Sequence, residues 1–165
     1  MPCPSPWRLP GRGAEVADNQ PLFQRVAVIG LGLIGGSLAS AIRSHNLARV
    51  VVGFDQKPED AALGVDLGVI DQAATTLEQA VRGSDLVVLA VPVRATRVVL
   101  EQIRPWLASD AVLTDVGSTK SSFVADVKAV FGKLSPRVIP GHPIAGSEQS
   151  GIRAANPDLF ANHKV

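Results

Sequence analysis

The sequence predicts a doubly wound α/β fold in which helices cover both faces of a parallel sheet. Short runs of apolar, mostly β-branched residues alternate along the chain with stretches of helical periodicity, which is the pattern of such a fold. These runs are apolar throughout, as is typical of parallel strands that are buried on both faces. The first run leads directly into a glycine-rich segment, as a buried strand does before a tight turn into a helix.

Each element is expected from its own pattern. Apolar runs predict strands at 26–29, 50–54, 85–91, 111–114 and 137–139. A weaker extended piece is expected at 73–75. Helical patterns predict helices at 37–45, 58–67, 95–107 and 120–131. Residues 1–24 are rich in proline and glycine, so we expect a disordered leader before a single domain at 25–165. The stretch 162–165 resembles the start of another strand, and we therefore expect the chain to be a fragment.

Composition and charge argue against several classes of protein. Sixteen basic and fifteen acidic residues leave a net charge of +1, which favours neither nucleic acid nor an anionic membrane as a partner. The one cysteine, Cys3, can form neither an internal disulfide nor a cysteine zinc site. No apolar run approaches the roughly 20 residues that span a bilayer, and no signal peptide is recognisable, so we expect a cytoplasmic protein. Segment 117–121 resembles the end of a P-loop, but Thr114 and Thr119 stand where glycines are required.

The glycine-rich segment matches the pattern G-x-G-x-x-G of a Rossmann-type dinucleotide site, with Gly30, Gly32 and Gly35 at its fixed positions. The first glycine permits a tight turn, the second lets the backbone approach a pyrophosphate, and the third lets the helix pack closely on the strand. Leu33 and Ile34 lie between the last two glycines, where free N–H groups and the positive end of the helix dipole face phosphate. We therefore expect these five residues to bind a dinucleotide.

Asp55 is expected to determine which dinucleotide binds. It ends the second strand, 20 residues after Gly35. Its carboxylate can accept hydrogen bonds from both ribose hydroxyls, whereas its charge would repel the 2′-phosphate of NADP. Lys57 is close enough in sequence to soften that repulsion. The pattern favours NAD over NADP.

Three further segments are expected at the carboxyl ends of strands, where ligands bind in an open α/β sheet. They are 90–94, 115–120 and 141–146. Val91 and Pro92 either offer an apolar wall to a cofactor ring or only close the strand. Ser118 either caps the following helix or binds a ligand hydroxyl, and the two roles are compatible. Arg94 and Lys120 either contact a ligand or are solvated residues at helix starts.

His142 is the candidate catalytic base. It stands between Gly141 and Pro143, which fix an unusual backbone at the end of a strand. Histidine side chains have an unperturbed pKa of about 6.5, so they exchange protons near neutral pH. His45 and His163 lack such a setting, and we expect them to be structural or surface residues.

Together these motifs resemble those of the prephenate/arogenate dehydrogenase family, over about residues 25–165. The matching motifs are V-I-G-L-G-L-I-G-G-S, G-F-D at 53–55, V-D-L-G-V-I-D at 65–71, A-V-P-V-R, D-V-G-S-T-K and G-H-P-I-A-G-S-E. The last two are specific, since dinucleotide-binding folds in general share only the first.

The resemblance implies an NAD-dependent enzyme of tyrosine biosynthesis that oxidises a cyclohexadienol and releases carbon dioxide from its ring. Prephenate, the expected substrate, would give 4-hydroxyphenylpyruvate; arogenate, the alternative, would give tyrosine. His142 would accept the proton of the ring hydroxyl while hydride passes to NAD, and Ser118 would contact that hydroxyl and the histidine. Glu148 either matches an acidic position at the substrate entrance or is an exposed loop carboxylate.

The resemblance also implies a helical C-terminal domain, which we expect to be missing from this chain after Val165, so that the chain departs from the family at its end. In the family that domain supplies homodimer contacts and an arginine that binds a substrate carboxylate. We therefore expect this chain to bind NAD with little activity of its own. Two alternatives stay open. One is another NAD(P)-dependent dehydrogenase or imine reductase, which leaves G-H-P-I-A-G unexplained, and the other is a regulatory module that binds NAD without turnover.

Overall fold

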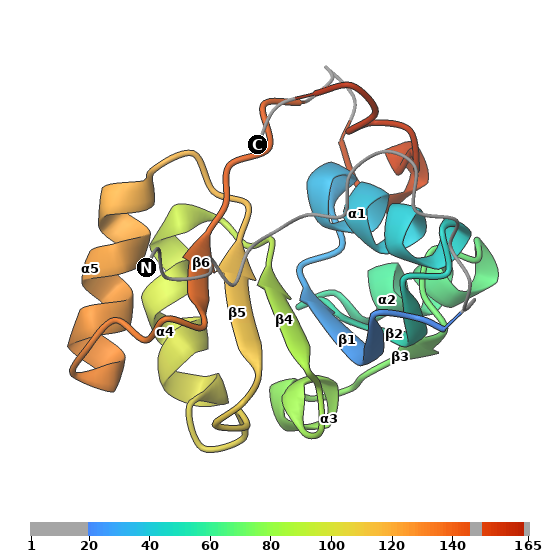
Figure 1. Ribbon diagram of the computed structural model, residues 1–165. Helices are drawn as coiled ribbons and strands as arrows, with labels where there is room; N and C mark the ends of the chain where they lie inside the picture. Colours follow the sequence, from blue (N-terminus) through green and yellow to red (C-terminus); the bar gives the residue numbers. More distant parts are fainter. Residues whose placement is uncertain (1–19, 146–149, 164–165) are drawn as a thin grey trace, which may run out of the picture.

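A parallel β-sheet forms the centre of the protein (Figure 1). The computed structural model describes residues 20–145 and 150–163, and in these residues six strands lie in the order β3-β2-β1-β4-β5-β6. The strands are β1 (Phe23–Ile29), β2 (Ala48–Phe54), β3 (Gln72–Ala73), β4 (Leu86–Leu89), β5 (Val112–Asp115) and β6 (Val138–Pro140). The helices are α1 (Leu33–Ser44), α2 (Pro58–Asp66), α3 (Leu77–Val81), α4 (Val93–Ile103), α5 (Lys120–Phe131) and the short 3₁₀ helix η1 (Ile152–Ala154). All neighbouring strands pair in parallel, which confirms the predicted fold class.

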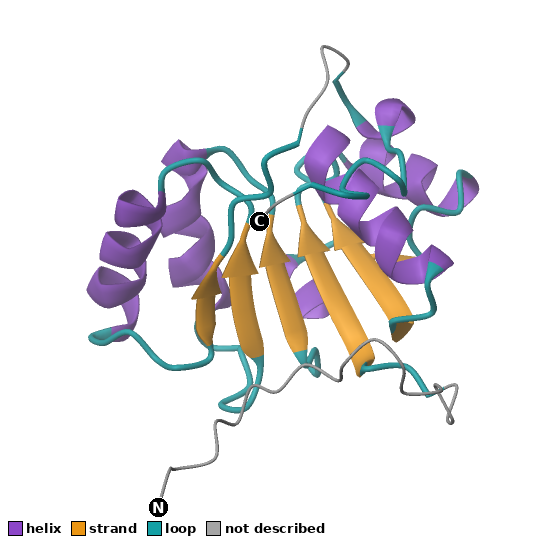
Figure 2. Ribbon diagram, turned by 45° about the horizontal axis from the view of Figure 1, so that its top comes forward, coloured by secondary structure: helices purple, strands orange, loops and turns teal. Residues whose placement is uncertain are grey.

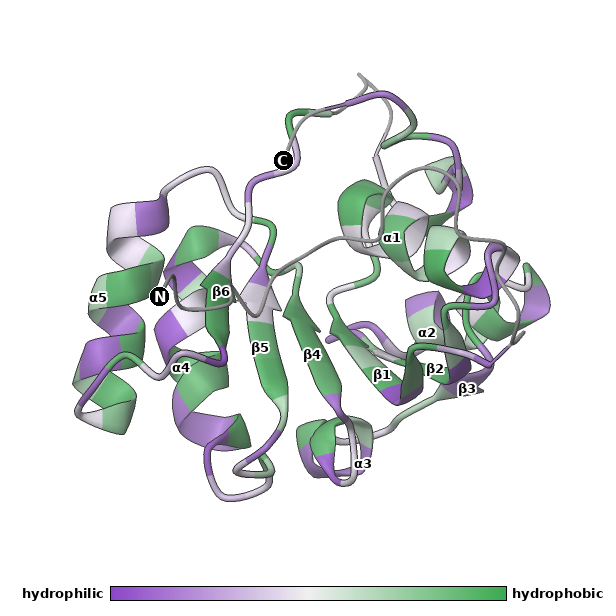
Figure 3. Cartoon of the chain, viewed as in Figure 1, coloured by the Kyte–Doolittle hydropathy of each residue, from purple (hydrophilic) through white to green (hydrophobic). Residues whose placement is uncertain are grey.

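The central strands are buried on both faces, with helices on either side of the sheet (Figure 2). Along β1, Val26 and Val28 join the apolar cluster under α1 and α2, whereas Ala27 and Ile29 join the cluster under α3, α4 and α5. All four side chains are at most 1% exposed. This two-sided burial explains why the central strands are apolar runs without alternation, which is visible as green ribbon in Figure 3.

Several boundaries differ from the expected ones, among them both ends of α4 and of β4, and two of the differences have clear physical reasons. α1 begins at Leu33 rather than at residue 37, because Gly32 is already its N-cap and the third glycine of the motif lies in its first turn. β1 begins at Phe23, before the expected domain start at residue 25. The Asp85 carboxylate holds this first part of the strand by accepting hydrogen bonds from two of its backbone N–H groups, at 2.6 and 2.8 Å.

The sequence pattern predicts neither α3 nor η1, since five and three residues are too few to show helical periodicity. α3 is instead started by its cap, because the Thr76 hydroxyl accepts a hydrogen bond from the backbone N–H of Gln79 at 3.1 Å.

The prediction of a strand at 162–165 is wrong for residues 162 and 163, which are the part of this stretch that the structure describes. Residues 157–162 form turns, and Asn162 has a left-handed φ of 63° that ends any extended run.

After β6 the chain returns across the molecule and packs η1 on α1 and α2 (Figure 1). Ile152 is 2% exposed and lies against Gly36 and Gly64, which have no side chains to exclude it. A Cβ at Gly64 would lie only 2.9 Å from the Cδ1 of Ile152. The backbone N–H of Asn156 also donates to the Ser37 hydroxyl at 2.9 Å. Residues 150–156, which we call the return segment, are thus fixed to α1 by apolar packing and by a hydrogen bond.

None of the helices in the described residues is both long and apolar enough to cross a membrane.

Replacing Ile152 by alanine is expected to lower the free energy of unfolding by about 2–4 kcal/mol, because the change leaves a cavity between α1 and α2. Denaturant unfolding of the chain measures this. Ile144→Ala is the matched control, since Ile144 is 63% exposed and its truncation should cost less than about 0.5 kcal/mol. Equal losses in the two variants would contradict the packing of the return segment described above.

Candidate functional site

A cleft of about 670 Å³ opens at the carboxyl ends of β1, β2 and β4. In the strand order, β1 and β4 are the neighbours at which the direction of winding reverses, and ligands bind at this point in open α/β sheets. The structure brings all eight expected cofactor-binding residues to this cleft. They are Gly30, Gly32, Leu33, Ile34, Gly35, Asp55, Val91 and Pro92. We call it the nucleotide cleft.

The three motif glycines meet different surroundings. Gly30 has a φ of +94°, which L side chains rarely adopt, and a Cβ there would collide with the carbonyl oxygen of Ala90. At Gly35 a Cβ would overlap the carbonyl oxygen of Gly30 and lie 2.8 Å from the Cβ of Ala90. At Gly32, by contrast, a Cβ would have nothing within 4 Å. Two glycines therefore permit close packing inside the protein, while the middle one faces the open space of the cleft.

The N-terminus of α1 lines this open space. Its N-cap, Gly32, has no side chain that could satisfy the free N–H groups of the first turn. Those groups and the helix dipole favour a negatively charged ligand, and a diphosphate fits this donor set. α1 is 12 residues long and has no acidic residue in its first turn to compete with such a ligand.

Asp55 is held in place by two backbone groups at the edge of the cleft. One carboxylate oxygen accepts a hydrogen bond from the N–H of Leu31 at 2.8 Å, and the other accepts one from the N–H of Lys57 at 3.0 Å. A carboxylate has about four lone-pair sites, so two remain for ribose hydroxyls. The bond to Leu31 also ties Asp55 to the glycine loop, a link that the sequence pattern does not reveal.

The apolar side of the cleft combines the two roles considered for its residues. Val91 is half-buried and packs against the core cluster under α4, yet it also lines the cleft. Pro92 is the N-cap of α4, and it stands three residues after β4 has ended at Leu89. Arg94 follows in the first turn of that helix as an exposed residue that does not line the cleft, in keeping with a solvated helix start. Ser150 and Gly151 of the return segment complete the lining, although no sequence signal points to them.

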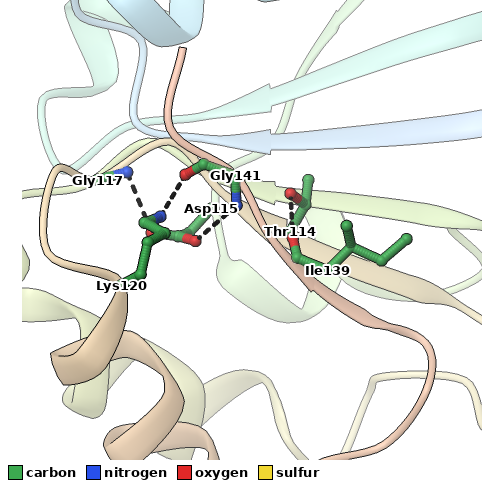
Figure 4. Close-up of polar contacts among 6 residues, drawn as sticks. All are labelled: Thr114, Asp115, Gly117, Lys120, Ile139 and Gly141. Carbon is green, nitrogen blue, oxygen red and sulfur yellow. Dashed lines mark hydrogen bonds and ion pairs between the residues drawn. The ribbon is translucent and has the colours of Figure 1, made fainter. Parts of the chain in front are cut away.

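A second cluster lies beside the cleft at the ends of β5 and β6, and we call it the Asp115 cluster (Figure 4). Asp115 is 5% exposed. One of its oxygens accepts hydrogen bonds from Lys120 Nζ at 2.5 Å and from the N–H of Gly117 at 3.0 Å. The other accepts one from the N–H of Gly141 at 3.3 Å, and Lys120 Nζ donates in addition to the carbonyl oxygen of Gly141. Lys120 is therefore half-buried in an ion pair with the buried Asp115 carboxylate, and it is not the freely solvated residue at a helix start that was one of its two expected roles.

His142 and Ser118 lie at the same edge of the sheet as the Asp115 cluster. His142 directly follows Gly141, and Ser118 belongs to the loop between β5 and α5; both are exposed. Both residues belong to the part of the chain that the structure describes, and their side chains form no hydrogen bond with each other. Ser118 is also not the cap of α5, because the N-cap is Thr119 and its side chain makes no capping bond.

The remaining candidates occupy other places. His163 Nδ1 donates to the carbonyl oxygen of Ile144 at 3.0 Å, and His45 ends α1 as its exposed C-cap, so both are structural or surface residues as expected. Glu148 lies outside the described residues. Within the described residues, no three histidine, cysteine, aspartate or glutamate side chains gather in a way that could hold a metal ion.

Comparison with known proteins agrees with the geometry of the cleft. The family model described as "Prephenate dehydrogenase, nucleotide-binding domain" matches residues 38–165. The chain is 38% identical over 138 residues to a prephenate dehydrogenase of Bacillus subtilis strain 168, covering 83% of this chain and 37% of that protein. It is also 38% identical over 148 residues to a cyclohexadienyl dehydrogenase of Zymomonas mobilis, covering 87% of this chain and 48% of that protein.

A solved structure agrees in three dimensions. The crystal structure of prephenate dehydrogenase from A. aeolicus in complex with hydroxyphenyl propionate and NAD+ superposes with a TM-score of 0.76 at 36% identity. The match covers 85% of this chain and 48% of that one. The chain thus spans less than half of the length of each of these three relatives. With a matching family model over most of its residues, the chain belongs to the prephenate dehydrogenase family, of which it contains the nucleotide-binding domain.

Proposed function

We propose that this chain is the NAD-binding part of a dehydrogenase that converts prephenate to 4-hydroxyphenylpyruvate with release of carbon dioxide. The observation that carries the proposal is the position of the His142 turn at the same carboxyl edge of the sheet as the nucleotide cleft. A proton acceptor beside a dinucleotide site is what oxidation of an alcohol by hydride transfer requires. Relatives named prephenate and cyclohexadienyl dehydrogenase support the choice of substrate class.

In this proposal the residues of the chain bind and orient both reactants. The N-terminus of α1 would hold the pyrophosphate, Asp55 the ribose hydroxyls, and Val91 with Pro92 the nicotinamide ring, since all of them line the cleft. The bound NAD supplies the hydride acceptor. His142 takes the proton of the ring hydroxyl as the carbinol carbon loses its hydride. The electrons of the bond to the ring carboxylate then shift through the ring to the new carbonyl oxygen, which takes up a proton and becomes the phenol hydroxyl as carbon dioxide leaves and the ring becomes aromatic.

The geometry of Asp55 supports NAD over NADP. Its carboxylate is fixed by Leu31 and Lys57 and cannot turn away from a ribose without losing these hydrogen bonds. A 2′-phosphate would therefore meet a negative charge at close range. Lys57 is also among the residues that line the cleft, which leaves weak binding of NADP compatible with the site.

NAD is expected to raise the melting temperature of the chain, and NADP at the same concentration to raise it less. A ligand present at about 100 times its dissociation constant adds about 2.7 kcal/mol to the free energy of unfolding. A thermal unfolding series with both nucleotides measures the difference. In Asp55→Asn the melting-temperature shifts caused by NAD and by NADP should become more alike, because the charge that repels the 2′-phosphate is gone. If millimolar NAD left the melting temperature unchanged, the nucleotide assignment would be wrong.

Two glycine variants separate binding from folding. Gly32→Ala should fold with nearly the stability of the parent chain, because its Cβ would meet nothing within 4 Å. It should nevertheless bind NAD at least about 10-fold more weakly, since that space is where the pyrophosphate would approach the backbone. Gly35→Ala should be destabilised even without nucleotide, because its Cβ would overlap the carbonyl oxygen of Gly30. Melting temperatures with and without NAD test both, and an NAD affinity unchanged in Gly32→Ala would contradict the placement of the pyrophosphate.

His142→Asn is expected to lower kcat by about 10²–10⁴-fold and to leave NAD affinity nearly unchanged, because asparagine cannot accept the proton. NADH formation with prephenate, and separately with arogenate, is measured in the protein that carries this domain. His45→Asn is the matched control, since His45 is the exposed C-cap of α1, away from the cleft. Unchanged turnover in His142→Asn would exclude it as the base. NAD binding without turnover of any substrate by the parent protein would instead favour the regulatory module.

A further inference from the structure

We propose that Asp115 and Lys120 are positioning residues that fix the backbone on both sides of Gly141 and thereby orient His142 toward the nucleotide cleft. This inference rests on the proposed role of His142 as the base. Neither side chain needs to touch a substrate or cofactor for this purpose. Their effect passes through the peptide groups of Gly141 (Figure 4).

The two hydrogen bonds reach two successive peptide groups. The N–H of Gly141 belongs to the peptide that leaves β6, and it donates to Asp115 Oδ1. The carbonyl of Gly141 belongs to the peptide that joins it to His142, and it accepts from Lys120 Nζ. Once that second peptide plane is fixed, the position of the His142 nitrogen is fixed as well. Pro143 further restricts His142 to extended backbone conformations.

His142 needs such support because it has little of its own. Its side chain is exposed, so packing does not hold it. β6 is an edge strand of three residues and pairs with β5 alone in the described sheet. The hydroxyl of Thr114 donates to the carbonyl oxygen of Ile139 at 2.7 Å and secures the strand up to its end. Beyond Pro140, the Asp115 cluster continues the attachment of the described chain to β5.

Close approach makes this attachment possible. A Cβ at Gly141 would lie 2.8 Å from the backbone oxygen of Asp115 and 3.3 Å from the Thr114 hydroxyl. Only glycine lets the turn approach β5 closely enough for its N–H and carbonyl to reach the ion pair. The glycine before the histidine therefore has a packing role distinct from those of the glycines in the nucleotide loop.

The ion pair is also fixed in space by its surroundings. Asp115 is almost fully buried, and a buried carboxylate is stable only when it is paired and hydrogen-bonded. Lys120 supplies the charge, the N–H of Gly117 supplies a further hydrogen bond, and the ammonium lies 5.6 Å from the centre of the Phe123 ring. Because Asp115 also binds Gly117, the same pair restrains the loop that carries Ser118. One ion pair thus holds both loops that bear the candidate catalytic residues.

Lys120→Met tests the proposal, with Lys120→Arg as the conservative variant and Lys128→Met as the matched control. Lys128 is exposed on the same helix, so its replacement removes the same charge without touching the cluster. Backbone nitrogen–proton correlation spectra of the chain report the environments of Gly141, His142 and Gly117. The NAD-induced shift in melting temperature reports folding and nucleotide binding in every variant. In the protein that turns over prephenate, kcat and KM are measured separately.

In Lys120→Met we expect large shifts of the Gly141 and His142 amide signals, with NAD affinity within about twofold of the parent. We expect kcat to fall by about 10–100-fold with little change in the KM for NAD, because a base displaced by about an ångström loses that much rate. Lys120→Arg should recover at least about a third of kcat, since its guanidinium can bridge the same carboxylate and carbonyl. Lys128→Met should change neither the amide signals of Gly141 and His142 nor kcat.

Amide signals of Gly141 and His142 that move no more in Lys120→Met than in Lys128→Met would overturn the proposal, as would an unchanged kcat. Should Lys120→Met not fold, Lys120→Gln replaces it, because glutamine keeps a hydrogen-bond donor to the Gly141 carbonyl but carries no charge. The amide signals and kcat of Lys120→Gln are then compared with those of Lys120→Arg. Absence of turnover in the parent protein would count against the proposed function. The spectra would still decide whether the ion pair fixes the histidine turn.

Discussion

The close approach of α1 to the ends of β1 and β4 is the constraint on which the site depends. Gly35 in α1 leaves no room for a side chain beside Gly30 and Ala90, and Gly30 leaves none beside Ala90. This contact places the first turn of α1 directly over the point where the strand order reverses. The nucleotide cleft exists there because the helix N-terminus, Asp55 at the end of β2 and the apolar segment after β4 all border the same point. Any side chain added at Gly30 or Gly35 would push these three borders apart.

Most of the fold could be predicted because its central strands are buried on both faces. β1, β2, β4 and β5 each contain a short run of apolar residues, and α5 begins and ends where its pattern predicts. The parts that could not be predicted depend on contacts between residues far apart in sequence. Ile152 has no periodic pattern around it, and its burial results from the missing side chains of Gly36 and Gly64 on two other helices. α3 and η1 are likewise too short to show a period.

The candidate site, like the fold, could be predicted from the sequence only in part. The eight expected nucleotide-binding residues follow from a local motif and from strand ends, and the fold brings them to one cleft. The links between motifs do not follow from local patterns. Nothing in the spacing reveals that Asp55 binds the N–H of Leu31, or that Lys120 donates to a carbonyl 21 residues later in the chain. At the start of an exposed helix a lysine is usually solvated, and here the burial of Asp115 overrides that expectation.

The segment after β6 is attached to the domain at two places on opposite sides of the cleft. Gly141 is tied to β5 and α5 through the Asp115 cluster, and η1 is tied to α1 and α2 through Ile152 and the Ser37 hydroxyl. Ser150 and Gly151, just before η1, line the nucleotide cleft. His142 therefore belongs to a stretch of chain whose further end borders the cleft itself. Because both attachments are made to rigid elements of the sheet and its helices, the histidine turn and the nucleotide cleft are held in one frame, as the proposed removal of a proton and a hydride from one substrate requires.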